Sequence, residues 1–250
     1  MRKSLIVAAL ALAFGARVAG AACPVDPFGS DDAGKATCDK DKSKCEQKAS
    51  KGVGKLVAGI IKCQTKLVDA GFKAKPPADE QACENAVIAK FLAGDTTACP
   101  CVVLPGISAL AESVLNGASD LTYCDSTSGV LISSLPANGA ADITGWVPAT
   151  KGDLKCQDKV GKNVGKLVGA WLKCHGKFAA DVVKTAGSPT FDEEGCEGAA
   201  VAAFNTANGA LICPACQAAA NASALVLTEA QLDGANSLTY CESPSGAFVQ

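Results

Sequence analysis

Arginine, histidine, methionine and aromatic side chains are all scarce in this chain of 250 residues. The only arginines are Arg2 and Arg17, the only histidine is His175, and aromatic residues make up 5% of the total. A core with so few aromatic side chains buries little apolar area per residue, and such a core depends on covalent cross-links. Because base readout relies mainly on arginine, nucleic acid is the least expected partner.

Long apolar runs are also missing, since no segment approaches the ~20 residues that a membrane-spanning helix needs. One run of 11 apolar residues, from Ser4 to Phe14, follows Arg2 and Lys3 and precedes small residues at 19–22. This layout predicts a signal peptide over 1–22 and an exported protein, extracellular, at the cell surface or periplasmic, with no membrane span. In the alternative reading, Cys23 is the lipidated first residue of a bacterial lipoprotein.

Cysteine is abundant by contrast, with 14 residues in the chain. In an exported protein an even number of cysteines is expected to form disulfides rather than a zinc site. The expected disulfide cysteines are Cys23, Cys38, Cys45, Cys63, Cys83, Cys99, Cys101, Cys124, Cys156, Cys174, Cys196, Cys213, Cys216 and Cys241.

The cysteine spacing repeats. Six cysteines from Cys45 to Cys124 recur from Cys156 to Cys241 at offsets that grow from 111 to 117, and residues 45–67 match 156–178 at 11 of 23 positions. This predicts a tandem duplication. We expect an N-terminal extension at 23–44, a first module at 45–129, a Pro- and Gly-containing linker at 130–150 and a second module at 151–250.

Each module is expected to be helical. Val53, Leu56, Val57 and Ile60 recur at helical spacing, and a weak strand candidate exists only at 130–133. A second helix is predicted from an N-cap at Asp79 to about residue 94, and a third over 107–116, with Gly117 as the residue after its end. In the second module, Thr228 and Gln231 have the spacing of a capping box. The predicted fold class is therefore all-α, with two tandem disulfide-stapled helical modules of about three helices each.

Helix geometry restricts the disulfide pairing. Cys45 and Cys63 are 18 residues apart, which places them on one stripe of a helix but ~27 Å apart along its axis. Neither they nor Cys156 and Cys174 can pair, and 12 of the 15 pairings within a module remain open. A helical hairpin in each module favours the bonds Cys63–Cys83 and Cys174–Cys196. A bond between Cys23 and Cys38 would hold the N-terminal extension. We expect three bonds within each module.

Motifs for chemistry are weak. Cys213-Pro-Ala-Cys216 permits a thiol oxidoreductase, but no βαβ pattern surrounds it, so structural bonding is the better interpretation. His175 is interpreted as an exposed polar residue beside a bonded cysteine. The glycines near Lys55 and Lys166 lack the phosphate-loop spacing and are interpreted as close helix contacts or as part of a lysine-side surface. We therefore expect no catalytic residue, no metal and no cofactor.

Charge is segregated along the chain. Residues 35–75 carry 11 lysines against 4 acids, residues 151–184 carry 8 against 3, and the segments that follow each are acidic. On a helical wheel the first group places five lysines within an arc of about 60°, and the same positions recur in the second module. This lysine ridge consists of Lys48, Lys51, Lys55, Lys62 and Lys66, with Lys159, Lys162, Lys166, Lys173 and Lys177.

A ridge of this kind is either a solvated helix face or a contact with something anionic. Anionic surface polymer, lipid headgroups and self-association through an acidic face are the candidate partners. The favoured function is a secreted, non-enzymatic, cysteine-rich repeat protein with a structural or surface-interaction role. The alternatives are a carrier of lipid or a small apolar ligand between the helices of a module, and the thiol oxidoreductase.

Overall fold

The computed structural model describes residues 33–76, 79–136 and 142–241. The expected signal peptide and Cys23 lie outside these residues. Six α-helices follow one another: α1 (Lys40–Phe72), α2 (Glu80–Leu92), α3 (Leu104–Gly117), α4 (Lys151–Lys184), α5 (Glu193–Gly209) and α6 (Cys216–Ala235). Short 3-10 turns complete the set: η1 (Ser119–Leu121), η2 (Ser126–Ser128), η3 (Ile132–Ser134) and η4 (Asn236–Leu238). The all-helical prediction is confirmed.

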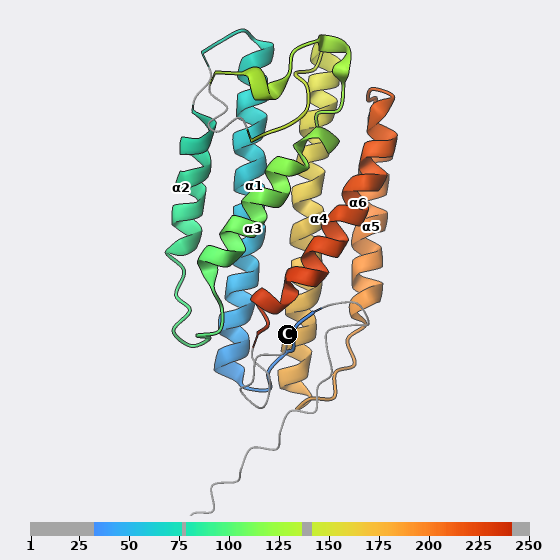
Figure 1. Ribbon diagram of the computed structural model, residues 1–250. Coiled ribbons are helices and arrows are strands. Elements are labelled where there is room, and N and C mark those ends of the chain that lie inside the picture. The colour runs from blue at the N-terminus through green and yellow to red at the C-terminus, as the bar shows by residue number, and fades with distance from the viewer. Residues whose placement is uncertain (1–32, 77–78, 137–141, 242–250) are drawn as a thin grey trace, which may run out of the picture.

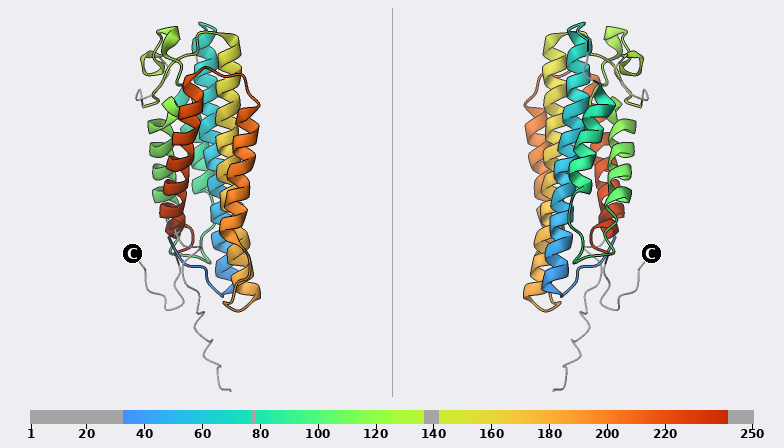
Figure 2. Two further views of the ribbon diagram at one scale, coloured as in Figure 1. Left: turned by 90° about the vertical axis from the view of Figure 1, so that its right-hand side faces the viewer. Right: turned by 90° about the vertical axis from the view of Figure 1, so that its left-hand side faces the viewer.

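The helices form two layers. The long helices α1 and α4 lie side by side and antiparallel, with α2 outside α1 and α5 outside α4 (Figure 1). Helices α3 and α6 cross this layer diagonally, and both lie on the same side of it (Figure 2). The arrangement is close to two-fold symmetric about an axis perpendicular to the layer, which is what a duplicated unit would produce. None of the described helices is both long and apolar enough to span a membrane.

Capping and small residues explain the two long helices. Asp39 accepts hydrogen bonds from the first turn of α1, and Thr150 does the same for α4. Where the helices meet, a Cβ placed on Gly54 would lie 3.7 Å from the Cα of Gly169, and one on Gly165 would lie 3.8 Å from the Cα of Ala58. The expectation that these glycines permit close helix contacts is confirmed.

The modules share one hydrophobic core. Val168 and Leu172 of α4 belong to the same buried cluster as Leu56, Ile60 and the other apolar residues of α1. The predicted linker also contributes, because its side chains at 132, 143 and 147 pack against α1 in a second cluster. The two halves of the chain thus bury their apolar surface against each other.

Disulfides connect the modules as well as closing them. The favoured bonds Cys63–Cys83 and Cys174–Cys196 are present, and the excluded pairs are absent from the described residues. Within the modules there are also Cys45–Cys99 and Cys156–Cys213. The expectation of three bonds within each module is wrong, because Cys101–Cys241 and Cys124–Cys216 run between them.

The inter-module bonds are reciprocal. Cys101 corresponds to Cys216 in the repeat and Cys124 corresponds to Cys241, so each bond joins the fifth cysteine of one module to the sixth of the other. The backbone shows the same exchange, since Lys35 donates to the Tyr240 carbonyl while its counterpart Trp146 donates to the Tyr123 carbonyl. Disulfides of this number indicate an oxidising compartment.

Local features of the helices agree with the sequence only in part. Asp79 does cap α2, accepting a hydrogen bond from the Ala82 N–H. The capping box at 228–231 is wrong, because Thr228 lies inside α6 and its hydroxyl donates to the Ala224 carbonyl. Gly117 is the last residue of α3 rather than the residue after it. The strand candidate is an isolated bridge between Leu131 and Trp146 followed by η3.

Candidate binding surfaces and buried polar clusters

The ten lysines of the ridge are all exposed. In the part of the chain that the structure describes, no carboxylate forms a salt bridge with any of them. Their ammonium groups are thus available to solvent or to a partner, as both interpretations of the ridge require, except that the Lys177 ammonium lies over the Phe191 ring, 5.4 Å from its centre.

Both halves of the ridge face the same side of the molecule. On α1, Gly54 and Ala58 mark the side that meets α4, and Gly52 and Gly59 mark the side that meets α2. The lysine arc lies between these two sides on a helical wheel. Val53, Val57 and Gln64, which face a cavity next to α3 and α6, lie on the opposite side of α1. The lysines therefore point away from α3 and α6, and the near two-fold symmetry gives α4 the same orientation.

The ridge continues beyond these ten lysines. Three more pairs of exposed lysines keep the offset of 111 residues and lie on the same arc or within about 20° of it: Lys40 and Lys151, Lys44 and Lys155, and Lys73 and Lys184. Of these, Lys44 and Lys73 form exposed salt bridges with Asp41 and Asp69. We call the sixteen lysines together the lysine face.

A groove runs along the α1 half of the lysine face, between α1 and α2. Its volume is about 700 Å³, and all five ridge lysines of the first module line it together with Lys90. The floor is apolar, formed by Leu56, Val87, Phe91 and Leu104, and Asp95 is the only acidic residue among the lining residues. A groove with a cationic rim and an apolar floor suits an anionic chain that also has apolar surface.

A second cavity lies between the modules, where α3 and α6 cross α1 and α4. Its volume is about 110 Å³ and its walls are mainly apolar. Val57 and Ile61 come from α1, Val168 and Leu172 from α4, and Leu227 from α6. The ligand of a carrier was expected between the helices of a single module, whereas this cavity is lined by residues of both modules.

A buried cluster of polar groups joins α1, α2 and α3 in the first module. The Gln64 amide donates to Asn116 at 2.9 Å, and the Asn116 amide donates to Glu84 at 3.4 Å and to Asp142 at 3.0 Å. Glu80 and Glu84 are both buried, and each carboxyl group influences the pKa of the other. Burial, and then the contact with Glu80, raise the pKa of Glu84 to about 9, and burial also raises the pKa of Glu80.

The matching positions of the second module hold a histidine. His175 occupies the place of Gln64, and Glu193 and Glu197 occupy the places of Glu80 and Glu84. The expectation that His175 is exposed is wrong, because its side chain is 0% exposed. Its Nε2 lies 2.8 Å from Glu197 Oε1 and 3.4 Å from Glu193 Oε1. The expectation failed because the acidic partners come from a different helix, α5.

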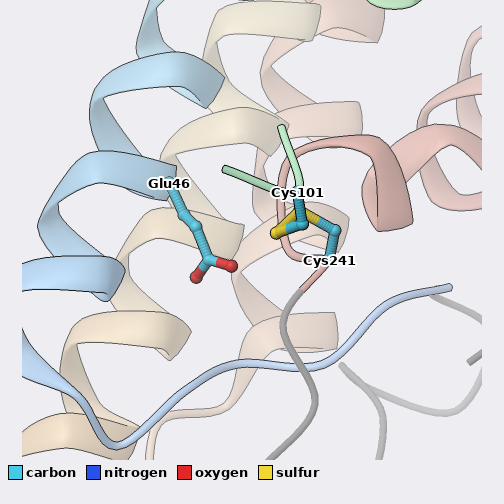
Figure 3. A group of neighbouring side chains, drawn as sticks. All are labelled: Glu46, Cys101 and Cys241. Carbon is cyan, nitrogen blue, oxygen red and sulfur yellow. A yellow bond between two sulfur atoms is a disulfide. The ribbon is translucent and has the colours of Figure 1, made fainter. Parts of the chain in front are cut away.

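Glu46, Cys101 and Cys241 form another group of potential ligand atoms, but its sulfur atoms are already used in another way. Figure 3 shows the Glu46 side chain reaching from α1 towards Cys101 and Cys241. The two sulfur atoms are bonded to each other, so neither is a thiolate that could bind a metal ion. This group is therefore a structural cross-link beside a buried carboxyl.

The two cysteines of the Cys-Pro-Ala-Cys motif are not bonded to each other. Cys213 pairs with Cys156 at the start of α4, and Cys216 pairs with Cys124 of the first module. Dithiol exchange in such motifs uses a bond between the two motif cysteines. The structural interpretation of these cysteines therefore has direct support.

No family model matches this chain, and no curated protein or solved structure matches it either.

Proposed function

We propose that the protein is an exported, non-enzymatic binding protein that contacts a linear anionic polymer at the cell surface through its lysine face. The observation that carries this proposal is the groove between α1 and α2, whose rim holds six lysines and a single acid. The repetition of the lysine arc on α4, pointing to the same side, extends the cationic surface over both long helices.

The shape of the lysine face favours an extended partner. From Lys40 to Lys66 the α1 half spans about 39 Å, at 1.5 Å per residue. A compact anion would contact two or three of these lysines, whereas a polymer lying along the helix can contact most of them. The large exposed apolar side chains of the described residues are Leu92, Val103, Val130, Leu131, Ile212, Val226 and Leu227, and none is on α1 or α4. A lipid bilayer would therefore meet no apolar wedge on this face.

The binding should be electrostatic and sensitive to salt. Each exposed lysine contributes at most about 1 kcal/mol, so useful affinity requires many simultaneous contacts. The Debye length falls from about 10 Å at 0.1 M salt to about 3 Å at 1 M, which removes most of this attraction. Lysine offers point charges without the fixed fork of arginine, which suits a polymer of irregular charge spacing.

The test uses the oxidised protein on columns of immobilised polygalacturonate and dextran sulfate, with elution by salt. Changing Lys55, Lys62 and Lys66 to Gln should lower the eluting salt concentration markedly, while changing the same residues to Arg should preserve it. Equal retention of all three proteins would contradict the proposal. Stronger binding to vesicles with anionic lipid than to either polymer would favour headgroups instead, and salt-dependent dimers would favour self-association. A catalytic turnover abolished by one side-chain change would contradict the non-enzymatic part.

The cavity between the modules favours a second candidate function, the carriage of a small apolar ligand. An engineered apolar cavity of 150 Å³ binds benzene, so about 110 Å³ suits a small ring or a short segment of an acyl chain. Native mass spectrometry of protein purified from its own host should then show a bound apolar molecule. Replacing Ala111 by Phe, which fills the cavity from α3, should remove it; a ligand-free mass for the unaltered protein would count against this candidate.

A further inference from the structure

We infer that His175, Glu193 and Glu197 form a binding site for a divalent first-row transition metal ion such as Zn²⁺. The sequence alone predicted no metal, and this site is independent of the lysine face. It is the one place in the described residues where a histidine and carboxylates bring ligand atoms within 4.8 Å of one another.

The donor set and its spacing fit such an ion. One imidazole nitrogen and two carboxylate oxygens are ligand types that zinc accepts, at about 2.0–2.2 Å. Tetrahedral bonds of that length place neighbouring ligand atoms about 3.3 Å apart. His175 Nε2 and Glu193 Oε1 are 3.4 Å apart, which is close to this spacing. The distance from His175 Nε2 to Glu197 Oε1 is 2.8 Å and would have to increase by about 0.5 Å.

Electrostatics gives the site a reason to hold a cation. The side chains of His175, Glu193 and Glu197 are 0%, 2% and 8% exposed, so their charges are largely removed from water. Two carboxylates beside one imidazole attract a cation, and this attraction is strong where water is largely excluded. A divalent ion with a neutral imidazole and two carboxylates forms a set with zero net charge.

Comparison of the modules points to the same conclusion. The first module keeps both acids as Glu80 and Glu84 but has Gln64 in place of the histidine, and the raised pKa of Glu84 shows that a proton compensates the charge there. In the second module the amide is replaced by imidazole, a much better metal ligand. Asn116 is likewise replaced by the buried Asp233 on α6. Both exchanges turn a neutral amide into a side chain of a kind that metal ions bind, and of the two only His175 belongs to the group of ligand atoms within 4.8 Å of one another.

The backbone holds the three ligands in place. Asp192 caps α5, so that Glu193 and Glu197 extend from its first two turns on one face. The Cys174–Cys196 disulfide joins the residue before His175 to the residue before Glu197. The bond therefore fixes the distance between the two helices at the ligand positions, which reduces the ordering needed when a metal binds.

The experiment measures zinc binding to the oxidised full chain after removal of metal with a chelator. Titration with ZnCl₂ by calorimetry should give about one equivalent bound, and Co²⁺ should give the visible absorption of a site with nitrogen and oxygen ligands. His175→Gln, which copies the first module and is therefore expected to fold, should weaken zinc binding at least 100-fold. Glu193→Gln provides an independent second variant with the same expected direction.

The opposite substitution supplies a gain of function. Gln64→His places an imidazole beside Glu80 and Glu84 and should raise the stoichiometry to two equivalents of zinc. Absence of zinc binding by the unaltered chain, or unchanged affinity in both His175→Gln and Glu193→Gln, would overturn the inference. A single equivalent in Gln64→His would contradict the claim that these three side chains suffice.

Discussion

The buried carboxyl pair of the first module allows a prediction about pH. Replacing Glu84 by Gln should stabilise the protein at neutral pH, because the glutamine keeps the size and hydrogen-bonding capacity of the protonated acid without its ionisation. The pKa of Glu84 is about 9 in the folded protein against a usual value of 4.5. A raised folded-state pKa means that the unfolded chain binds fewer protons than the folded chain between these values, so stability falls as pH rises.

The size of the effect follows from the same two values. Each pH unit between 4.5 and 9 corresponds to about 1.4 kcal/mol, so the contribution of Glu84 is fully present below pH 4.5 and is lost progressively up to pH 9. Relative to the natural chain, Glu84→Gln should gain about 3 kcal/mol in unfolding free energy at pH 7. The two proteins should have similar stability at pH 4.

Urea denaturation of the oxidised proteins at pH 4, 5.5, 7 and 8.5 measures this difference directly. The exposed Glu229 provides a matched control, because Glu229→Gln removes the same group without altering a buried pair. A difference between Glu84→Gln and the natural chain that stays constant with pH would refute the reasoning. A stabilisation by Glu84→Gln that decreases as the pH rises would have the opposite pH dependence and would also refute the reasoning.

Two further predictions concern the packing of the modules. The double substitution Cys124→Ala and Cys216→Ala removes one inter-module disulfide, whose loop spans 92 residues along the chain or about 50 through the other inter-module bond. In the chain-entropy treatment this should lower the free energy of unfolding by about 4 kcal/mol. A decrease below 1 kcal/mol, measured by urea denaturation without reductant, would show that the modules are held together without this bond. A methyl group added at Gly59 would overlap Val87, so Gly59→Ala should cost about 1–3 kcal/mol. A methyl group added at Gly169 on α4 meets nothing within 4 Å, so Gly169→Ala should instead stabilise the protein by about 0.5–1 kcal/mol. Melting temperatures that shift in the same direction in both glycine variants would contradict this contrast.

The lysine ridge could be found before the structure because it depends on helical periodicity alone. Lys48 and Lys66 share a face of α1 in any continuous helix, and the repeat placed Lys159 and Lys177 on the same face of α4. The groove beside the ridge could not be found in this way, because it requires the position of α2. Whether both ridges face one side depends on how α1 packs against α4.

The buried polar clusters show a different kind of limit. No acidic residue of α4 lies one turn before or after His175. Its partners Glu193 and Glu197 are on α5, and they reach His175 only because the chain turns between α4 and α5. One signal was present in the sequence: the second module keeps both acids of the first and exchanges Gln64 for a histidine. Reading the two modules against each other at these positions would have placed the three side chains together.

Local information in the chain was enough to determine the helices, the repeat and the impossibility of Cys45–Cys63, because hydrogen bonding and side-chain periodicity act over a few residues. Pairing of distant cysteines was decided by tertiary structure, since any sulfur can bond with any other that packing brings within reach. The modules resemble each other closely, so the sequence could not distinguish a bond within a module from its reciprocal counterpart between modules. The burial of apolar surface between α1 and α4 resolved that choice and produced one cross-linked molecule with a shared core.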